Sequence, residues 1–264
     1  MIHPFSAAVV PSERSFLRQT LQRLLLPAIA LSITLGGLPM AALAQDYVPP
    51  NRGLPGRREG GGTRGCWTSP TLTSSQNRLT ALVPAQNLGY TLNEHPTFFV
   101  YIPAFYADKA VAAEFILSDD QDNEIYRTRF TTADQSGILR ISLPAEANMA
   151  PLEVGRDYHW SFALVCDLND PSGNLVVDSW IQRVQPSPAL AASLAQASPD
   201  ELPALYAQSG IWYDALSSLT DPYRQPTDPA TTAQWQTLLN AVGLSNIAAE
   251  LPTVAPSASR LPQR

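Results

Sequence analysis

Short apolar runs separated by polar turns dominate the chain from residue 66 to residue 185. Each run is rich in β-branched and aromatic residues and is bounded by Pro, Gly, Asn or Asp: 79–83, 97–102, 113–117, 125–130, 138–143, 158–166 and 175–184. In run 158–166 the large apolar side chains fall on one side with a period of two residues: Tyr158, Trp160, Phe162 and Leu164. With no helix-length gap between these runs, we predict an antiparallel, Ig-like β-sandwich of about seven strands over residues 66–185.

The periodicity becomes helical after Pro188. Segments rich in Ala and Leu, without clusters of β-branched residues, follow at 189–197, 199–208, 212–219, 232–242 and 245–250. Shifted by 33 residues, this region matches itself, with Gly210 aligned to Gly243, and the offset is close to a tetratricopeptide period. We therefore expect an α+β protein in which a small C-terminal helical subdomain, residues 186–252, forms tetratricopeptide-like hairpins that dock on the sandwich.

Two features of this helical region bear on function. Trp212 and Tyr213 are adjacent, so on one helix their rings point about 100° apart. Either the helix is covered on two sides and both rings are buried, or one ring is an exposed anchor for a partner. Gly210 is expected at a tight turn with positive φ, where Ala or Val would not fit.

The N-terminal 44 residues have the pattern of a signal peptide. Arg14, Arg18 and Arg23 precede the uncharged apolar stretch 24–38, and Ala42-Leu43-Ala44 fits a small-x-small cleavage site. No twin-Arg pair precedes the apolar stretch, so we predict a Sec-type signal cleaved after Ala44, the alternative being an uncleaved anchor. The mature protein would be periplasmic or secreted, with no stable membrane span after cleavage.

Low-complexity segments border the predicted domains. Residues 45–65 contain repeated Pro and Gly without apolar periodicity, which predicts a flexible linker, and residues 253–264 are expected to form a disordered tail. The run from Gly60 to Gly65 satisfies the spacing of a phosphate-binding loop. It follows a linker rather than a strand, however, and does not open a helix, so nucleotide binding is not expected.

The two cysteines, Cys66 and Cys166, are predicted to form one disulfide, because an even pair in an oxidising compartment usually does. The alternatives are two buried thiols or a metal site. A metal site needs more ligands, and after the predicted cleavage only His95 and His159 remain, with no spacing that pairs them.

Composition excludes several classes of protein. With 45% hydrophobic and 15% charged residues, the chain is not intrinsically disordered. A net charge of -6 and a pI near 5.0 argue against nucleic acid as a partner. No helical or apolar segment after residue 44 is long enough to cross a bilayer.

Candidate chemistry is sparse. Asp119, Asp120, Asp122 and Glu124 lie between two predicted strands, where they form a solvated hairpin turn or, alternatively, bind calcium, although the pattern of an EF-hand loop is missing. His159 faces away from the apolar side of its strand, and His95 precedes Pro96 at a strand entrance. There is no G-x-S-x-G motif. We therefore predict no catalytic residue, no cofactor and no metal.

The ordered blocks of the chain resemble DUF928, a family of uncharacterised secreted proteins found mainly in cyanobacteria. The resemblance spans roughly residues 60–250 and rests on the order and spacing of these blocks: GTRGC at 62–66, LTALVP at 79–84, PTFFVY at 96–101, EFIL at 114–117, ISLP at 141–144, YHWSF at 158–162, WIQRV at 180–184 and GIWYDAL at 210–216. It implies no known activity, cofactor or catalytic residue.

These observations predict an exported, non-enzymatic protein-interaction module whose partner is an unknown envelope protein. The alternative is an envelope hydrolase or a carbohydrate-binding protein that uses an unrecognised cleft.

Overall fold

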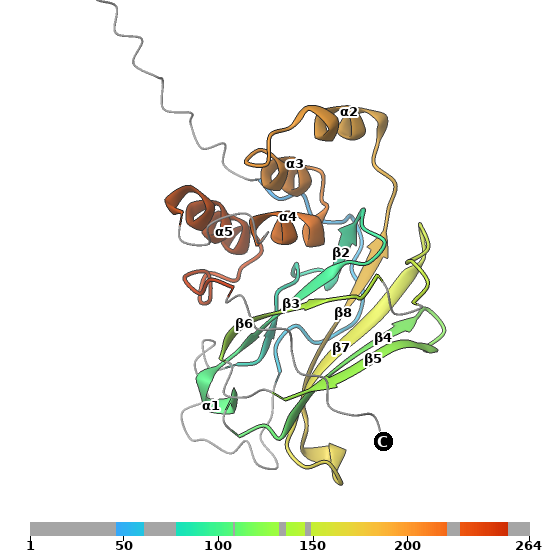
Figure 1. The fold of residues 1–264 in the computed structure, drawn as a ribbon, viewed down its shortest axis with the longest axis vertical. Coiled ribbons are helices and arrows are strands. Elements are labelled where there is room, and N and C mark those ends of the chain that lie inside the picture. The colour runs from blue at the N-terminus through green and yellow to red at the C-terminus, as the bar shows by residue number, and fades with distance from the viewer. Residues whose placement is uncertain are drawn as a thin grey trace, which may run out of the picture. The chain divides into compact units, whose positions relative to one another are not determined.

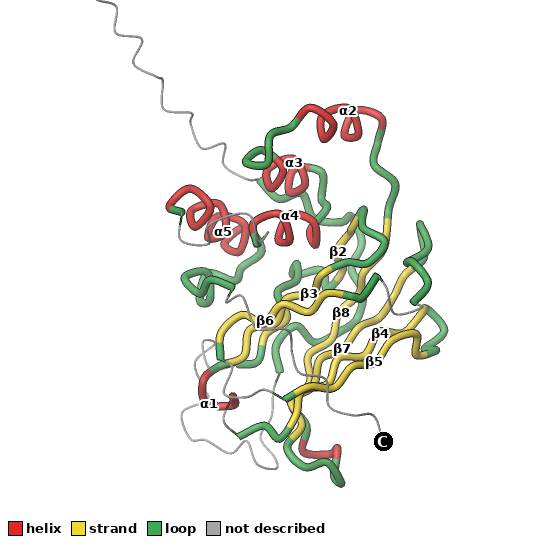
Figure 2. The backbone as a smooth tube through the Cα atoms, viewed as in Figure 1, coloured by secondary structure: helices red, strands yellow, loops and turns green. Residues whose placement is uncertain are grey.

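The computed structural model describes residues 46–60, 78–107, 109–131, 136–145, 149–220 and 228–252. All of them belong to one compact unit, residues 43–264. The predicted signal peptide and C-terminal tail lie outside the described residues, as do Cys66 and most of the glycine-rich run. The fold is mixed, with two β-sheets and a set of helices (Figures 1 and 2).

The larger sheet has five strands in the order β2-β8-β7-β4-β5. Their bounds are Leu88–Thr91 for β2, Ala112–Asp119 for β4, Glu124–Phe130 for β5, Asp157–Val165 for β7 and Leu175–Arg183 for β8. All neighbouring strands are antiparallel except β2 and β8, which run parallel. The prediction of a purely antiparallel sandwich is therefore wrong at this edge, because β2 was not among the predicted strands.

The smaller sheet has three antiparallel strands in the order β1-β3-β6. They span Thr80–Ala81, Thr97–Ile102 and Gly137–Ser142, and the short helix α1, Ala104–Ala107, follows β3. Both sheets contribute to one core, in which the Phe98 ring of β3 lies 4.9 Å from Phe115 of β4 and 5.2 Å from Trp160 of β7. The described strands form two sheets that contact each other through these rings.

Residues 46–60, which we call the strap, contradict the prediction of a flexible linker. The Arg57 carbonyl accepts a hydrogen bond from the Asp178 amide of β8 (2.9 Å), and the Gly60 amide donates to the Leu79 carbonyl beside β1 (2.7 Å). Isolated bridges also join Arg57 to Asp178 and Glu59 to Thr80. The strap therefore connects β8 of the five-stranded sheet to β1, an edge strand of the three-stranded sheet.

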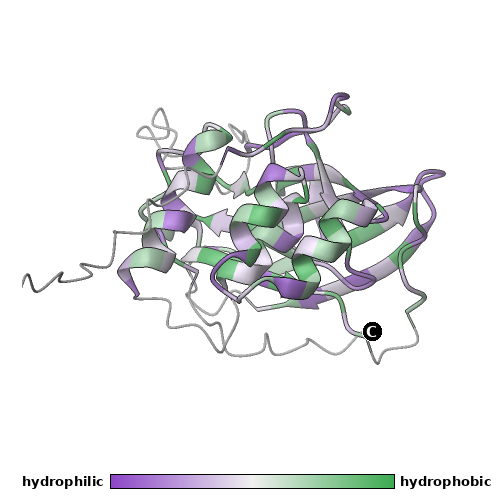
Figure 3. Ribbon diagram, turned by 90° about the horizontal axis from the view of Figure 1, so that it is seen from above, coloured by the Kyte–Doolittle hydropathy of each residue, from purple (hydrophilic) through white to green (hydrophobic). Residues whose placement is uncertain are grey.

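Four further helices follow the strands. They are α2 (Pro188–Gln196), α3 (Leu202–Gln208), α4 (Trp212–Leu219) and α5 (Pro229–Ala241). The side chains of Ser187 and Asp228 accept backbone N–H groups at the starts of α2 and α5, as expected of N-cap residues. Viewed from above, the helices lie in front of the strands (Figure 3). No helix in the described ranges is long and apolar enough to cross a membrane.

Helices α3 and α5 end in the same hydrogen-bonded motif. After α3, Gly210 has φ 75°, its amide donates to the Ala207 carbonyl (3.0 Å), and the Ile211 amide donates to the Tyr206 carbonyl (2.9 Å). After α5, Gly243 has φ 74°, its amide donates to the Asn240 carbonyl (3.0 Å), and the Leu244 amide donates to the Leu239 carbonyl (2.9 Å). Both helices therefore end in a Schellman motif, and the glycines of the two motifs, Gly210 and Gly243, are the residues that the 33-residue repeat aligns.

The predicted helix at 245–250 is wrong. After Gly243 the chain forms successive turns, in which the Ile247 amide donates to the Leu244 carbonyl (3.1 Å) and the Glu250 amide to the Ile247 carbonyl (3.0 Å). The indole N–H of Trp235 binds the Glu250 carbonyl (2.8 Å) and holds the segment against α5. Leu244 and Ile247 are buried there, so the apolar residues that predicted a helix pack as turns.

Candidate functional site

Trp212 and Tyr213 are both buried, with 0% and 1% of their surface exposed. The indole N–H of Trp212 donates to the Leu82 carbonyl (2.8 Å), and its ring lies 4.9 Å from Tyr47 of the strap. The Tyr213 ring lies 5.4 Å from Phe98 in the core. Helix α4 is therefore covered on one side by the strap and on the other by the sheets. Of the two interpretations that the sequence allowed, the structure shows burial on two sides, and neither Trp212 nor Tyr213 is the exposed partner-binding anchor of the alternative.

The hydroxyl of Tyr213 belongs to a buried hydrogen-bond chain. It accepts the indole N–H of Trp160 (2.8 Å) and donates to the Trp180 carbonyl (3.2 Å). Burial raises the pKa of Tyr213 well above its ordinary value, so the phenol stays protonated at any physiological pH. Its role is to satisfy polar groups inside the core rather than to transfer protons.

Asp214, the next residue, joins α4 to the chain after β2. Its Oδ2 accepts the Thr91 hydroxyl (2.6 Å) and the Leu92 amide (3.1 Å). Burial raises the pKa of Asp214 to about 6, although both hydrogen bonds act to lower it. Asp214 was not among the predicted site residues, and its signal in the sequence is an acidic side chain within a largely apolar segment.

His159 and Asp178 lie next to each other on the outer face of the five-stranded sheet. The Nε2 atom of His159 is 3.1 Å from Asp178 Oδ2, and the imidazole ring lies 4.7 Å from the ring of Trp180. A carboxylate in this position orients an imidazole, as it does in hydrolases. Ser161, on the same face, makes no hydrogen bond to His159 in the described part of the chain. In this pair Asp178 orients the imidazole of His159, but no nucleophilic side chain in the described residues is hydrogen-bonded to that imidazole.

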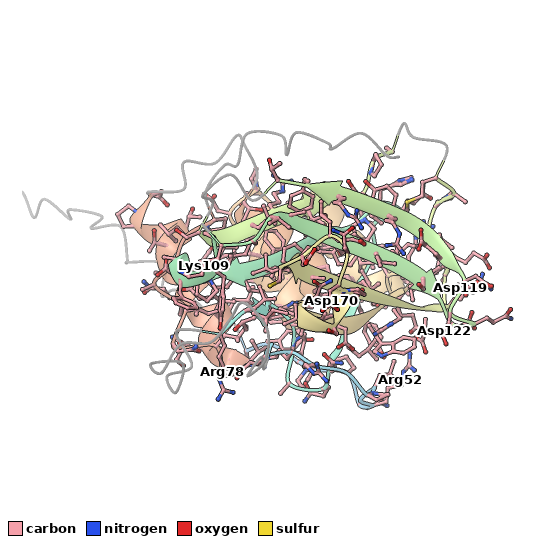
Figure 4. All side chains as sticks on the ribbon, turned by 90° about the horizontal axis from the view of Figure 1, so that it is seen from below. Arg52, Arg78, Lys109, Asp119, Asp122 and Asp170 are labelled. Atoms are coloured by element: carbon pink, nitrogen blue, oxygen red, sulfur yellow. The ribbon has the colours of Figure 1, made fainter. Side chains whose placement is uncertain are left out.

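The acidic residues of the β4–β5 turn hold the turn together. Asp119 Oδ1 accepts the amides of Gln121 (2.9 Å) and Asn123 (2.8 Å), and Asp119 Oδ2 pairs with Arg156 (2.8 Å). The side-chain amide of Asn123 is the largest cause that lowers the pKa of Asp119. Figure 4 shows Asp119 and Asp122 near each other at this end of the sheet. Within the described ranges, no group of three or more His, Cys, Asp or Glu gathers to hold a metal ion.

An ion-pair cluster occupies the outer face of β4 and β5. Glu114 is only 8% exposed, and its carboxylate accepts from Arg127 (2.5 Å) and Arg129 (2.9 Å). Arg127 also pairs with Glu124. In run 125–130 the two arginines, Arg127 and Arg129, are two residues apart and therefore share this face of the sheet, which they form together with Glu114 of β4.

The remaining candidates have structural roles or lie outside the described residues. The His95 amide donates to Asn93 Oδ1 (2.9 Å), which agrees with the expected place in a turn. The Gly60 amide donates to the Leu79 carbonyl beside β1, and the rest of the glycine-rich run lies outside the described residues. Cys166 follows β7, and its amide donates to Asn174 Oδ1 (3.3 Å). Because Cys66 lies outside the described residues, the Cys66–Cys166 disulfide stays a prediction, which thiol labelling of the denatured, unreduced protein tests.

Helix α2 has an unusual surface for a water-facing element. Its sequence, PALAASLAQ, contains no charged residue, and none of its residues is buried. Leu190 and Leu194 are half-buried on one side, and α3 is the helix that α2 contacts. The side opposite the leucines carries mainly small apolar residues, with the polar Gln196 among them. We call its apolar part the α2 face: Pro188, Ala189, Ala192 and Ala195, all exposed. Figure 1 shows α2 at the end of the series α4, α3, α2.

Comparison with known proteins identifies a family and nothing more specific. The family model described as Domain of Unknown Function (DUF928) matches residues 59–251. No curated protein and no solved structure matches the chain.

Proposed function

The chain belongs to the DUF928 family, and from its geometry we propose that it is an exported, non-enzymatic protein-interaction module of the cell envelope. The N-terminal pattern of Arg14, Arg18 and Arg23 followed by an uncharged apolar stretch supports export by a Sec-type signal, with cleavage after Ala44. Mass spectrometry of the mature protein should find Gln45 at the N-terminus. An intact Met1 in the exported fraction would contradict this part of the proposal.

The observation that carries the interaction function is the α2 face. An isolated helix of nine residues is marginal in water, and helices of this length depend on packing against a partner surface. In stacks of helices, the terminal helix normally has a polar outer side that keeps the stack soluble. Helix α2 ends such a stack with Ala192 and Ala195 facing outward and with no charge. A binding partner that covers these residues accounts for this composition.

The titratable groups support a non-enzymatic protein. Asp119, Glu114 and Glu124 are paired with arginines, and each contributes to a turn or to the charged sheet face. The pKa of Asp214 is raised to about 6, but its carboxyl is bound to Thr91 and Leu92 at the junction of α4 and β2. A perturbed pKa marks a catalytic group when it faces a cleft, and this group faces a hydrogen-bonded junction.

The helical layer also supports the tetratricopeptide-like part of the predicted fold. The α3–α4 hairpin turns at a Schellman glycine, and the same motif recurs one period later at Gly243. Only the first of these turns leads into a helix, so the described chain has one complete hairpin. We propose that this hairpin, with α2 beside it, is the start of a helical stack that a partner continues, next to an Ig-like sandwich in which β2 is a parallel addition.

The experiment that tests the function compares two exposed apolar positions. In an affinity capture from envelope extract, Ala192→Glu should lose the proteins that the wild type retains, because a charge in an apolar interface is costly to desolvate. Leu168→Glu is the matched control, since Leu168 is 61% exposed on the loop between β7 and β8. Circular dichroism should show that both variants fold. If Ala192→Glu retains the same proteins as Leu168→Glu, the α2 face is not the binding surface.

A second candidate function, hydrolysis, is favoured by one observation, the hydrogen-bonded pair His159 and Asp178. In that case the purified protein should hydrolyse chromogenic esters or glycosides, and His159→Ala should abolish the activity. Equal rates for the wild type and His159→Ala would exclude a catalytic role for this pair.

A further inference from the structure

We propose that the N-terminal part of the strap is a detachable cover over the protein's own surface. Residues 46–57, which we call the arm, release from the folded protein as a unit, while residues 58–60, which we call the pivot, stay in place. The strap is the blue segment in Figure 1. This inference does not depend on the proposed function, because it involves neither the α2 face nor a partner.

The pivot is held by closely spaced contacts. The Arg58 carbonyl accepts the Ala81 amide (2.8 Å), and the Gly60 amide donates to the Leu79 carbonyl (2.7 Å). The Arg58 guanidinium also donates to the carbonyl of Val242 after α5 (2.8 Å). These bonds fix the pivot to the smaller sheet and to the end of a helix.

The arm is held by contacts that are further apart. Its backbone hydrogen bonds to the backbone of other described residues lie at Val48, Leu54 and Arg57, whereas a strand within a sheet pairs at alternate residues. The arm also contains three prolines, which have no amide hydrogen to donate. The ion pair of Arg52 with Asp157 contributes little, since the Arg52 side chain is 38% exposed.

Two buried polar side chains at the contact of the arm have no hydrogen-bond partner in the described structure. Tyr47 is 9% exposed, and its hydroxyl is unpaired. Asn87 is 6% exposed, and neither the nitrogen nor the oxygen of its carboxamide is paired. This carboxamide lies against Gly56 of the arm, where a Cβ atom would be 1.6 Å from Asn87 Nδ2. Docking of the arm therefore buries polar atoms without replacing their bonds to water, which costs free energy.

The Tyr47 ring opposes release. It packs edge-on against Trp212, with the ring centres 4.9 Å apart, and its apolar burial favours the docked arm. The unpaired polar atoms reduce this preference, because water reaches them when the arm is released. A segment with this balance opens at a lower free energy than the whole protein unfolds.

Release of the arm uncovers groups that the docked arm occupies. The Asp178 amide of β8 donates to the Arg57 carbonyl (2.9 Å), and the indole N–H of Trp180 donates to the Pro55 carbonyl (2.7 Å). The Trp212 ring loses its cover at the same time. The arm is thus an internal ligand, and any segment that binds these groups binds only the fraction of molecules whose arm is released.

Native-state hydrogen exchange of the mature protein tests the release with a matched pair of amides. The Asp178 amide donates to the arm at Arg57, and the Ala81 amide donates to the pivot at Arg58. We expect the protection factor of Asp178 to be at least about 10-fold smaller than that of Ala81, because the Asp178 amide is exposed whenever the arm is released. Equal protection of the two amides would overturn the inference.

Two variants should shift the release in opposite directions. Gly56→Ala places a Cβ atom against Asn87 and should reduce the protection of Asp178 by a further factor of about 10. Tyr47→Phe removes an unpaired hydroxyl and should increase this protection by about 3- to 10-fold. The protection of Ala81 should be unchanged in both variants.

The amides of β7 report unfolding of the whole protein, because β7 is the middle strand of the five-stranded sheet. In Gly56→Ala they should keep the protection that they have in the wild type. If β7 and Ala81 lose as much protection as Asp178, the arm is not a separate unit and the inference fails. Unchanged protection of Asp178 in Tyr47→Phe would also overturn it, because the buried hydroxyl would then not oppose docking.

Discussion

The carbonyl oxygen of Val48 lies only 2.7 Å from the place that a Cβ atom on Gly210 would occupy. Val48 belongs to the strap, and its amide donates to the Ala207 carbonyl (3.1 Å), so the strap is tied to the last turn of α3. Gly210 has φ 75°, a conformation that L-amino acids with a side chain rarely adopt. Two separate restrictions therefore require glycine at this turn.

The first prediction compares Gly210→Ala with Gly243→Ala. Both glycines end a helix with nearly the same φ, so backbone strain should cost about 1 kcal/mol at either site. A Cβ on Gly243 has no neighbour closer than 4.0 Å, whereas at Gly210 the strap backbone must move, which should add about 1–3 kcal/mol. Urea denaturation measures the difference, and Gly210→Val should be more destabilised still. Equal losses of stability for the two Ala variants would show that the strap does not pack tightly there.

The second prediction concerns the buried hydroxyl of Tyr213. Tyr213→Phe removes the acceptor of the Trp160 indole N–H and the donor to the Trp180 carbonyl, and leaving these groups unpaired should cost about 1–3 kcal/mol. Tyr47→Phe is the matched control, because the Tyr47 hydroxyl is buried and makes no hydrogen bond in the described structure. Its removal should be neutral or slightly stabilising. Chemical denaturation should therefore show a lower free energy of unfolding for Tyr213→Phe and no loss for Tyr47→Phe, and a similar loss in both would contradict the hydrogen-bond assignment.

The third prediction concerns Arg58, which connects the strap to α5. Its guanidinium donates to the carbonyls of Val242 (2.8 Å) and Gly243 (3.0 Å), which lie at the C-terminal end of that helix. Burial lowers the pKa of Arg58, although it remains charged. Arg58→Ala should destabilise the protein by about 2 kcal/mol, the range for hydrogen bonds to a charged group.

Arg78 supplies the control for Arg58. It pairs with Glu59 at 3.0 Å, and its side chain is 45% exposed. An exposed ion pair contributes at most about 1 kcal/mol, so Arg78→Ala should have little effect on thermal unfolding. If Arg58→Ala melts at the same temperature as Arg78→Ala, the strap does not stabilise the helical layer.

Much of the β-structure was predictable because its strands have strong local patterns. In β7, large apolar residues alternate with small or polar ones, and Trp160 and Phe162 are fully buried as expected. Strand β2 was missed because Leu88–Thr91 is short and interrupted by Gly89. The structure explains this glycine, since a Cβ there would lie 2.6 Å from the Tyr213 ring of α4. A close approach of this kind has no local sequence signal.

The packing of the strap, the burial of Trp212 and Tyr213 and the exposure of helix α2 could not be predicted from the sequence, because each depends on contacts between segments that are distant in the chain. Pro and Gly in residues 46–60 indicate an irregular segment, and its bridges at Arg57 and Glu59 and the burial of Tyr47 in the core become visible only in the fold. Trp212 and Tyr213 allowed two interpretations because burial on two sides depends on Tyr47, which is remote in sequence. Helix α2 was predictable as a helix, but its lack of buried residues emerges only when its neighbours are placed.

The last prediction is a pH dependence that Asp214 controls. Its folded-state pKa is raised from 3.8 to about 6, chiefly by burial, so the folded protein prefers the protonated carboxyl. The stabilisation from this group is fully present below pH 3.8 and is lost as pH rises through about 6, amounting to roughly 2–3 kcal/mol for a shift of this size. Tyr206 is the titratable neighbour that Asp214 influences, and burial raises its pKa, so it does not titrate in this window.

Asp214→Asn should remove this pH dependence. Asparagine can accept from Thr91 and Leu92 without becoming charged, so at pH 7.5 the variant should be at least as stable as the wild type, and at pH 4 its advantage should disappear. Other carboxylates, such as Asp119 and Glu124, have lowered pKa values and act in the opposite direction in both proteins. The informative quantity is therefore the difference in unfolding free energy between variant and wild type, measured by urea denaturation from pH 4 to 7.5. A difference that stays constant over this range would show that the carboxyl of Asp214 is already ionised at pH 4 in the folded protein.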